Sequence, residues 1–170
     1  MVKTPDTAPI LIASDHAGFE LKQAIKSLLK QHTWIDLGPI NGSDTVDYPD
    51  FAETLGRKIA NGEAARGILI CGSGIGMSIA ANKISGIRAA LVENPVSARL
   101  SREHNDANVL CLGSRFVAPA YGAEIAMTWL ETPFSGAPRH CQRVEKIAAL
   151  DHLRAKASPS KTQGSTGDGK

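Results

Sequence analysis

The stretch GILICGSGIGMSIAANK (67–83) joins an apolar run to a glycine-rich loop and then to a helical pattern. Residues 67–71 suit a buried strand, and Ile75, Ile79 and Ala80 recur at the spacing of one helix face. Glycines between a strand and a helix let the backbone turn tightly and direct free N–H groups at an anion. The stretch therefore predicts a β–α unit with an anion site at its turn.

The same alternation recurs along the chain. Further apolar runs lie at 10–14, 33–37, 88–92 and 108–112, and helical patterns separate them. Repeated β–α units form parallel sheets covered by helices on both faces. We predict one α/β domain over residues 10–154, a doubly wound, Rossmann-like parallel sheet of about five strands.

The two ends of the chain carry little that could join a core. Residues 1–9 are expected to form a flexible leader. Residues 155–170 hold no large apolar side chain, so we expect a disordered tail.

Composition narrows the class of protein. The net charge of +2 gives no reason to expect nucleic acid or a membrane surface as a partner. No stretch has the roughly 20 apolar residues of a membrane helix, and the start lacks a secretory signal pattern, which favours the cytoplasm. The three cysteines form no CxxC pair, so neither a disulfide framework nor a zinc site is expected.

Polar residues follow several of the predicted strands. Asp15 and His16 come after the first strand, Cys71 ends the third, and Arg115 comes after the fifth. Ligands of doubly wound sheets bind beyond the carboxyl ends of the strands. These residues therefore mark the candidate site, although Asp15 could equally act as a helix N-cap.

The loop CGSGIG (71–76) has two interpretations. One is a dinucleotide-binding fingerprint, with Glu93 about 20 residues further on as the ribose ligand. Counting GxGxxG from Gly72, however, places Met77 at the third glycine, where it would crowd the helix–strand contact. The count thus favours the other interpretation, a site for a phosphate or an oxyanion.

Cys71 occupies the last strand position before this loop. A thiol at a helix N-terminus is expected to have a lowered pKa, and its thiolate could act as a general base. The alternative is an inert buried cysteine, which is how we interpret Cys111 inside VLCLG.

Two more polar clusters lie outside the strand ends. His104 and Asn105 precede the fifth strand, where turn chemistry explains the Asn but not the His. Arg139 and Arg143 are four residues apart, so they share a helix face that could bind phosphate or simply be solvated.

Five motifs together resemble one known family. They are SDHAGFELK (14–22), DYPDFA (47–52), CGSGIGMSIAANK (71–83), REHNDANVLCLGSR (102–115) and RHCQRVEKI (139–147). In this order they are similar to the sugar-phosphate isomerase family that holds ribose-5-phosphate isomerase B and the galactose-6-phosphate isomerase subunits. Some relatives place a glutamate where Met77 stands, so this chain resembles the cysteine type.

The resemblance implies a role for each matching residue. Cys71 would move the proton between C1 and C2, Ser73 would position the base or the substrate oxygen, and His104 would open the furanose ring. Asn105 and the N–H groups of residues 72–76, among them Gly72, Gly74 and Gly76, would stabilise the enediolate oxygen. Asp15 would bind sugar hydroxyls and Tyr48 would lie beside the substrate. His16, Arg115, Arg139 and Arg143 would hold the phosphate.

The resemblance also implies an assembly and a substrate class. A homodimer or homotetramer is expected, with residues 102–105 and part of the phosphate clamp contributed by the neighbouring chain. No metal or cofactor is expected. Ribose 5-phosphate and ribulose 5-phosphate are the first choice of substrate, and allose or galactose 6-phosphate is the alternative. A non-catalytic sugar-phosphate sensor would need His16 and the arginines, but neither Cys71 nor His104.

Overall fold

Five parallel strands form a single sheet at the centre of the chain. The computed structural model describes residues 8–157, with side chains described as far as Asp151. The strand order is β2-β1-β3-β5-β4. The predicted fold class is confirmed, and the strands are β1 (Ile10–Ser14), β2 (Trp34–Asp36), β3 (Arg66–Cys71), β4 (Ala89–Leu91) and β5 (Val109–Gly113).

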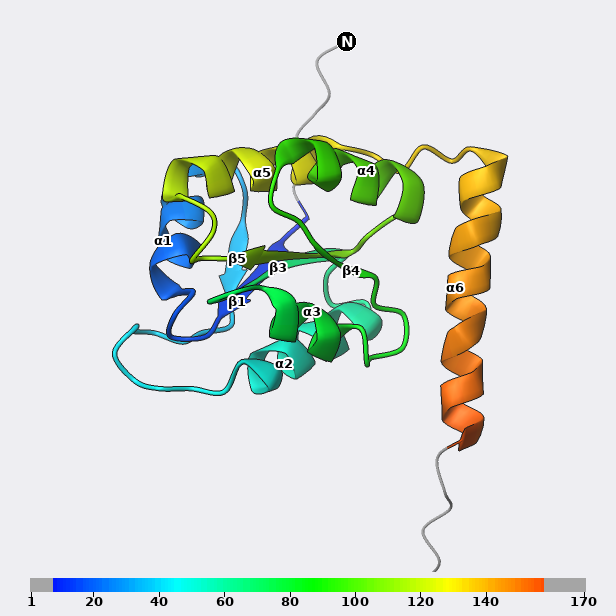
Figure 1. Cartoon of the computed structure of the whole chain (residues 1–170), viewed down its shortest axis with the longest axis horizontal. Helices are drawn as coiled ribbons and strands as arrows, with labels where there is room; N and C mark the ends of the chain where they lie inside the picture. The colour runs from blue at the N-terminus through cyan, green and yellow to red at the C-terminus, as the bar shows by residue number, and fades with distance from the viewer. Residues whose placement is uncertain (1–7, 158–170) are drawn as a thin grey trace, which may run out of the picture.

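Helices cover both faces of the sheet (Figure 1). One face carries α1 (Phe19–Leu28), α4 (Pro95–Asn105) and α5 (Pro119–Glu131). The other carries α2 (Tyr48–Ala60) and α3 (Ile75–Ala81). The sixth helix, α6 (Pro138–Ala157), stands beside the β4 edge of the sheet and contacts α4.

The two helical layers enclose two apolar cores, one on each face of the sheet. Alternate residues of a strand point to opposite faces. Ile10 and Ile12 of β1 accordingly pack with α1, α4 and α5, whereas Leu11 and Ala13 pack with α2 and α3. This double burial explains why the strands read as continuous apolar runs.

The order of the strands creates a topological switch point. The chain steps from β1 outward to β2, returns to β3 on the other side of β1, crosses to the outermost strand β4, and places β5 between β3 and β4. The switch lies between β1 and β3, whose carboxyl ends are Ser14 and Cys71. In open sheets of this kind, ligands bind at such a switch point.

Two details differ from the sequence pattern. Ile75 and Ile79 are both more than half exposed, and α3 instead buries Met77 and Ala81 against the sheet. Helix α6 continues to Ala157, past the predicted domain end at 154. Most of the predicted leader and tail lies outside the described residues. Within residues 8–157, no helix is both long and apolar enough to cross a membrane.

Candidate active site

Cys71 lies at the switch point, on the last position of β3. Its side chain is only 4% exposed, and its sulfur accepts a hydrogen bond from the Gly74 backbone N–H at 3.0 Å. The Cys71 carbonyl accepts the Ser114 N–H at 2.9 Å, which ties the loop to the end of β5. The Cys71 thiol is therefore held in one place at the switch point.

The loop conformation depends on Gly74. Its φ of 75° lies in the left-handed region, where side chains are strained. A Cβ atom there would also stand 2.5 Å from Leu91 Cδ1 and 2.9 Å from the Leu112 carbonyl carbon. Only glycine lets the chain turn from β3 into α3 while the amide points back at the Cys71 sulfur.

Two other glycines admit side chains from outside the loop. The guanidinium of Arg115 lies against Gly72, where an added Cβ would come within 3.1 Å of Cζ and Nε. The phenol ring of Tyr48 lies against Gly76, where an added Cβ would meet ring atoms at 2.5 Å. The glycines thus bring a cation and a phenol to the loop that carries Cys71.

Asp15 and His16 follow β1 on the same edge. Asp15 is buried, and its Oδ1 accepts the Gly18 N–H at 2.8 Å. This bond closes the turn ahead of α1, but the N-cap residue of α1 is Gly18, so Asp15 is not the helix N-cap. The Nδ1 atom of His16 accepts the Val46 N–H at 3.4 Å. We call these residues the sheet-edge group: Asp15, His16, Tyr48, Cys71, Ser73, Arg115 and the glycines 72, 74 and 76.

The remaining predicted residues lie elsewhere in the chain. Because α4 returns from the carboxyl end of β4 to the amino end of β5, its last residues, His104 and Asn105, lie at the opposite edge of the sheet. The five residues of β5 span roughly 15 Å at about 3.3 Å per residue. We call His104, Asn105, Arg139 and Arg143 the helix-end group.

His140 joins this helix-end group, and the sequence analysis missed it. Its ring lies 4.3 Å from the His104 ring, centroid to centroid. Arg139 Nε donates to His140 Nε2 at 3.1 Å, so the proton of the neutral ring sits on Nδ1, 2.7 Å from Ser135 Oγ. Burial lowers the pKa of His140, and the charges of His104, Arg139 and Arg143 add to this. The motif RHCQR contained the residue, but its spacing gave no sign that it faces His104.

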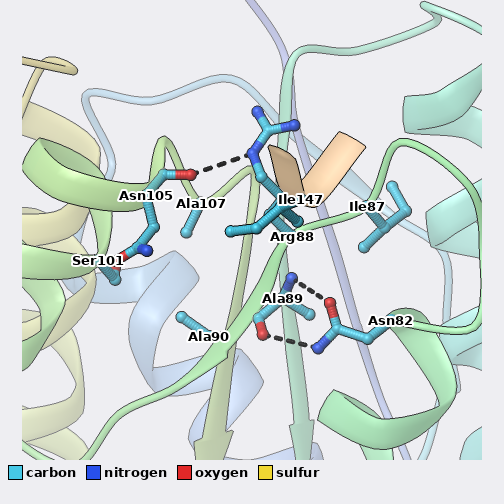
Figure 2. A pocket seen from close by; sticks show the side chains of 9 residues that line it. All are labelled: Asn82, Ile87, Arg88, Ala89, Ala90, Ser101, Asn105, Ala107 and Ile147. Atoms are coloured by element: carbon cyan, nitrogen blue, oxygen red, sulfur yellow. Dashed lines mark hydrogen bonds between the residues drawn. The ribbon is translucent and has the colours of Figure 1, made fainter. Parts of the chain in front are cut away.

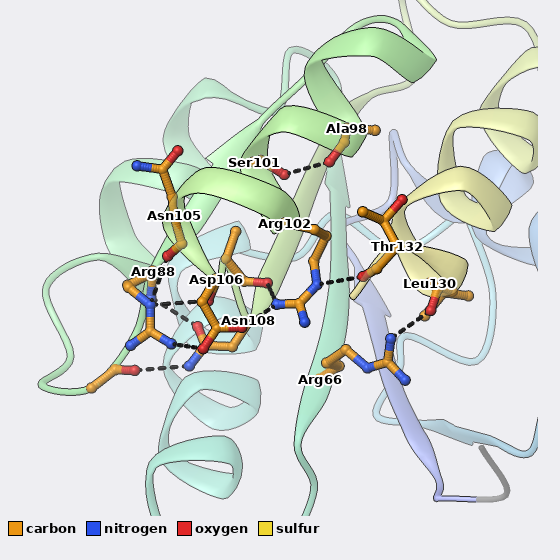
Figure 3. A network of polar contacts seen from close by, with 12 residues as sticks. Arg66, Arg88, Ala98, Ser101, Arg102, Asn105, Asp106, Asn108, Leu130 and Thr132 are labelled. Carbon is orange, nitrogen blue, oxygen red and sulfur yellow. Dashed lines mark hydrogen bonds and ion pairs between the residues drawn. The ribbon is translucent and has the colours of Figure 1, made fainter. Parts of the chain in front are cut away.

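Ion pairs fix the turn that carries His104 and Asn105 (Figure 3). Asp106 ends α4 with a φ of 45°. Its two carboxylate oxygens pair with Arg102 at 2.8 Å and with Arg88 at 3.0 Å. Arg88 Nε also donates to the Asn105 carbonyl at 3.1 Å. Burial lowers the pKa of Arg102, and Asp106 counteracts that effect.

A cavity of about 230 Å³ lies between β4, α4 and α6 (Figure 2). Several of its polar lining groups already have partners. The Asn82 side chain bonds both the N–H and the carbonyl of Ala89, at 2.9 and 2.8 Å. Ile87 and Ile147 make other walls apolar. Among its lining residues Arg88 carries the only positive charge, and Asn105 of the helix-end group also lines the cavity.

Two further features bear on the chemistry of the chain: the second buried cysteine and the side chains that could bind a metal ion. Burial, together with the neighbouring Cys71, raises the pKa of the Cys111 thiol, which agrees with an inert core cysteine. In the described part of the chain, no three His, Cys, Asp or Glu side chains lie close enough to hold a metal ion.

Comparison with known proteins gives one consistent result. The Ribose/Galactose Isomerase family model matches residues 10–147. Ribose-5-phosphate isomerase B of Escherichia coli is 46% identical over 147 residues, which cover 85% of this chain and 97% of the relative. D-erythrulose-4-phosphate isomerase of Pectobacterium atrosepticum is 41% identical over 145 residues, 84% of this chain and 95% of the relative.

Solved structures agree with the sequence relatives. The type B ribose 5-phosphate isomerase of Trypanosoma brucei superposes with a TM-score of 0.81 at 49% identity, covering 85% of this chain and 99% of that one. Ribose-5-phosphate isomerase B of Mycoplasma genitalium, solved with bound ribulose-5-phosphate, gives 0.79 at 44% identity, covering 85% and 96%. The matches extend over the whole sheet and both groups of site residues, and on this evidence the chain belongs to the ribose/galactose isomerase family and is a sugar phosphate isomerase.

Proposed function

We propose that the chain interconverts ribose 5-phosphate and ribulose 5-phosphate, with Cys71 as the base. The observation that carries this proposal is the placement of the Cys71 sulfur. It lies at the switch point, it is held by the Gly74 N–H at 3.0 Å, and Arg115 and Tyr48 flank its loop. A ribulose-5-phosphate complex of a relative 44% identical supports the same substrate.

The reaction moves one proton through an enediolate. As a thiolate, Cys71 would remove the proton next to the carbonyl and return it to the neighbouring carbon. The N–H groups of Gly74 and Ile75 are engaged by Cys71 Sγ and Ser73 Oγ. Stabilisation of the enediolate oxygen therefore falls to the remaining amides of residues 72–76 and to Asn105.

The phosphate and the hydroxyls would be bound around this centre. Arg115 and His16 reach the phosphate from the sheet-edge group, and Arg139 and Arg143 reach it from the helix-end group, because guanidinium groups match phosphate oxygens. Asp15 keeps one carboxylate oxygen on Gly18, so the other would take a sugar hydroxyl. Binding energy from the phosphate holds the sugar in place for proton transfer.

We further propose that a complete site needs two copies of the chain. His104, which would open the furanose ring, and Cys71 lie at opposite edges of one sheet. A symmetric dimer could bring the helix-end group of one copy to the sheet-edge group of the other. Exposed apolar residues offer a surface for this contact on α3, α4 and α6: Ile75, Ile79, Val96, Ile147 and Leu150.

A second candidate substrate is a four-carbon sugar phosphate. The relative from Pectobacterium atrosepticum favours it, because that protein is named for erythrulose 4-phosphate. A four-carbon aldose 4-phosphate carries its phosphate on the oxygen that would close a furanose ring. Such a substrate needs no ring opening, so its turnover would not depend on His104. Six-carbon phosphates remain a further alternative within a family named for ribose and galactose.

The test is formation of ribulose 5-phosphate from ribose 5-phosphate without added metal, by wild type and by Cys71→Ala. We expect turnover by wild type and a loss of at least about 1,000-fold in the variant, the upper range for a general base. Activity that survives Cys71→Ala would remove the thiol from the mechanism. Wild-type turnover of erythrulose 4-phosphate or a six-carbon phosphate, with none of ribose 5-phosphate, would overturn the five-carbon assignment.

A further inference from the structure

Lys22 is buried more completely than any other charged side chain in the described part of the protein. It belongs to α1 and has 0% exposure, whereas lysines are almost always at the surface. Burial lowers the pKa of Lys22, and the Asp36 carboxylate counteracts this. A charge in such a place needs partners on every side.

Three partners surround the Lys22 ammonium. Nζ donates to Asp36 Oδ1 at 2.8 Å and to the Pro39 carbonyl at 2.7 Å, and it lies 5.2 Å from the centre of the Phe19 ring. Asp36 Oδ1 also accepts the Gly38 N–H at 2.9 Å. Lys22 and Asp36 therefore hold the first residues of the loop that follows β2.

This loop, residues 38–47, runs from β2 to Tyr48 along the edge that carries the sheet-edge group (Figure 1). Its start is fixed to β1, because Ser14 donates to the Gly38 carbonyl at 3.0 Å. Its middle lies on Phe19, where an added Cβ at Gly42 would come within 3.1 Å of the ring. The far end of the loop bonds His16 of the sheet-edge group.

That bond selects one form of His16. The Val46 N–H donates to His16 Nδ1, so Nδ1 carries no proton. In the neutral ring the proton then sits on Nε2, which is left to donate to an anion. If the loop moved, His16 could exchange tautomers or rotate, and the donor would be lost.

We infer that Lys22 is a positioning residue: through Asp36 and the Pro39 carbonyl it holds the 38–47 loop, and the loop keeps His16 with Nε2–H ready for the substrate phosphate. This inference rests on the proposed isomerase function for the part that His16 plays.

Lys26 supplies a matched control. It also pairs with Asp36, at 2.6 Å, but its side chain is 27% exposed and it donates to Oδ2 rather than to the oxygen that holds the loop. Lys22→Met and Lys26→Met each remove one ammonium from the same carboxylate. Only Lys22→Met removes the bond to the Pro39 carbonyl.

The first measurement is the tautomer of His16 in ¹⁵N-labelled full-length protein, with the signal assigned by its loss in His16→Gln. We expect the Nε2–H form in wild type and in Lys26→Met, and a mixture of tautomers in Lys22→Met. Inorganic phosphate, titrated as the probe, should bind to Lys22→Met more weakly than it binds to wild type or to Lys26→Met.

Kinetics gives the second readout. For ribose 5-phosphate, Lys22→Met should raise KM roughly tenfold, the scale of one hydrogen bond to a charged group, and leave kcat within about twofold. Equal tautomers and equal KM values in Lys22→Met and Lys26→Met would overturn the inference.

A double variant covers the case in which Lys22→Met does not fold. Lys22→Met/Asp36→Leu removes the Lys22 ammonium and the Asp36 carboxylate together, so the variant carries no unpaired charge at the Lys22 position while both loop anchors are lost. Wild-type His16 behaviour in this protein would also overturn the inference. If wild type fails to isomerise ribose 5-phosphate, the proposed function fails, while the tautomer and the phosphate titration still decide the role of Lys22.

Discussion

The His104 ring lies on the His140 ring, with 4.3 Å between centroids and a tilt of 41°. His104 is therefore oriented by a histidine that is itself held by Arg139 Nε on one nitrogen and by Ser135 Oγ on the other. Two adjacent imidazoliums would repel each other, so this packing favours a neutral His140. The stability of the helix-end group should therefore depend on pH.

Replacement of His140 should make the protein less sensitive to acid. Burial lowers the pKa of His140 in the folded state, so the unfolded chain binds its proton first, near pH 6.5. The stability that neutral His140 contributes is present above about pH 6.5 and is lost as pH falls toward the lowered pKa. Between pH 7.5 and 5.5, Tm should fall less in His140→Asn than in wild type. An equal fall would contradict this account.

Mixed assemblies should recover activity that neither parent has. We expect Cys71→Ala and Arg139→Ala to be nearly inactive alone, because each lacks one half of every shared site. Subunits mixed at equal amounts should regain about a quarter of wild-type activity, since half the dimers would carry one intact site. Activity that stays at the level of the parents after subunit exchange would count against a site shared between copies.

Asp106→Asn should disturb catalysis more than stability. Asparagine tolerates the φ of 45°, but it loses the charge that pairs with Arg102 and Arg88. With that carboxylate about one third exposed, we expect a loss of about 1 kcal/mol in unfolding free energy, discounted for solvent screening. Turnover of ribose 5-phosphate should fall by roughly tenfold, because a misplaced catalytic group costs at least that much.

The control for Asp106→Asn is Arg99→Gln on the same helix. Arg99 and Glu103 form an exposed pair at 2.8 Å, and such pairs contribute no more than about 0.5 kcal/mol. Chemical unfolding and steady-state kinetics of the two variants separate the effects. A loss of turnover in Arg99→Gln as large as in Asp106→Asn would show that any change in α4 suffices.

Gly74→Ala should be far more disruptive than the same change at Gly62. Both glycines have a left-handed φ, 75° and 79°, so each substitution meets a backbone penalty of about 1–2 kcal/mol. At Gly62 nothing lies within 4 Å of the new Cβ, whereas at Gly74 it overlaps Leu91 and the Leu112 backbone. We expect Gly62→Ala to stay active and Gly74→Ala to lose both stability and activity. If Gly62→Ala and Gly74→Ala unfolded at the same urea concentration, the close packing of Leu91 and Leu112 around Gly74 would have no role in stability.

The fold could be predicted from the sequence because both faces of the sheet are buried. Each strand therefore appears in the sequence as a short run of apolar residues between helical patterns. The apolar runs and Cys71, at a strand end beside a glycine loop, follow directly from this pattern. The exposed Ile75 and Ile79 do not, because a helix of seven residues, α3, has too few turns for spacing to tell its buried face from its exposed one.

The site was only partly predictable for a different reason. Most residues of the sheet-edge group lie at strand ends or on the loop that follows β3, so topology alone gathers them. Tyr48 is the exception, because it begins α2 and meets the loop through its contact with Gly76. His140 and Lys22 act through contacts with residues that are distant in the sequence, His104 for the first and Asp36 and Pro39 for the second. Nothing in their local sequence distinguishes a histidine that orients another histidine, or a lysine that holds a loop, from ordinary surface residues.

The Asn82 side chain occupies hydrogen-bonding groups on an edge strand of the sheet. β4 is an edge strand, and an uncovered edge is a template on which further chains can add strands without limit. The Asn82 amide bonds both the N–H and the carbonyl of Ala89, and so takes the place of a neighbouring strand at that position of β4. A further strand that approached β4 would find these two backbone groups already occupied.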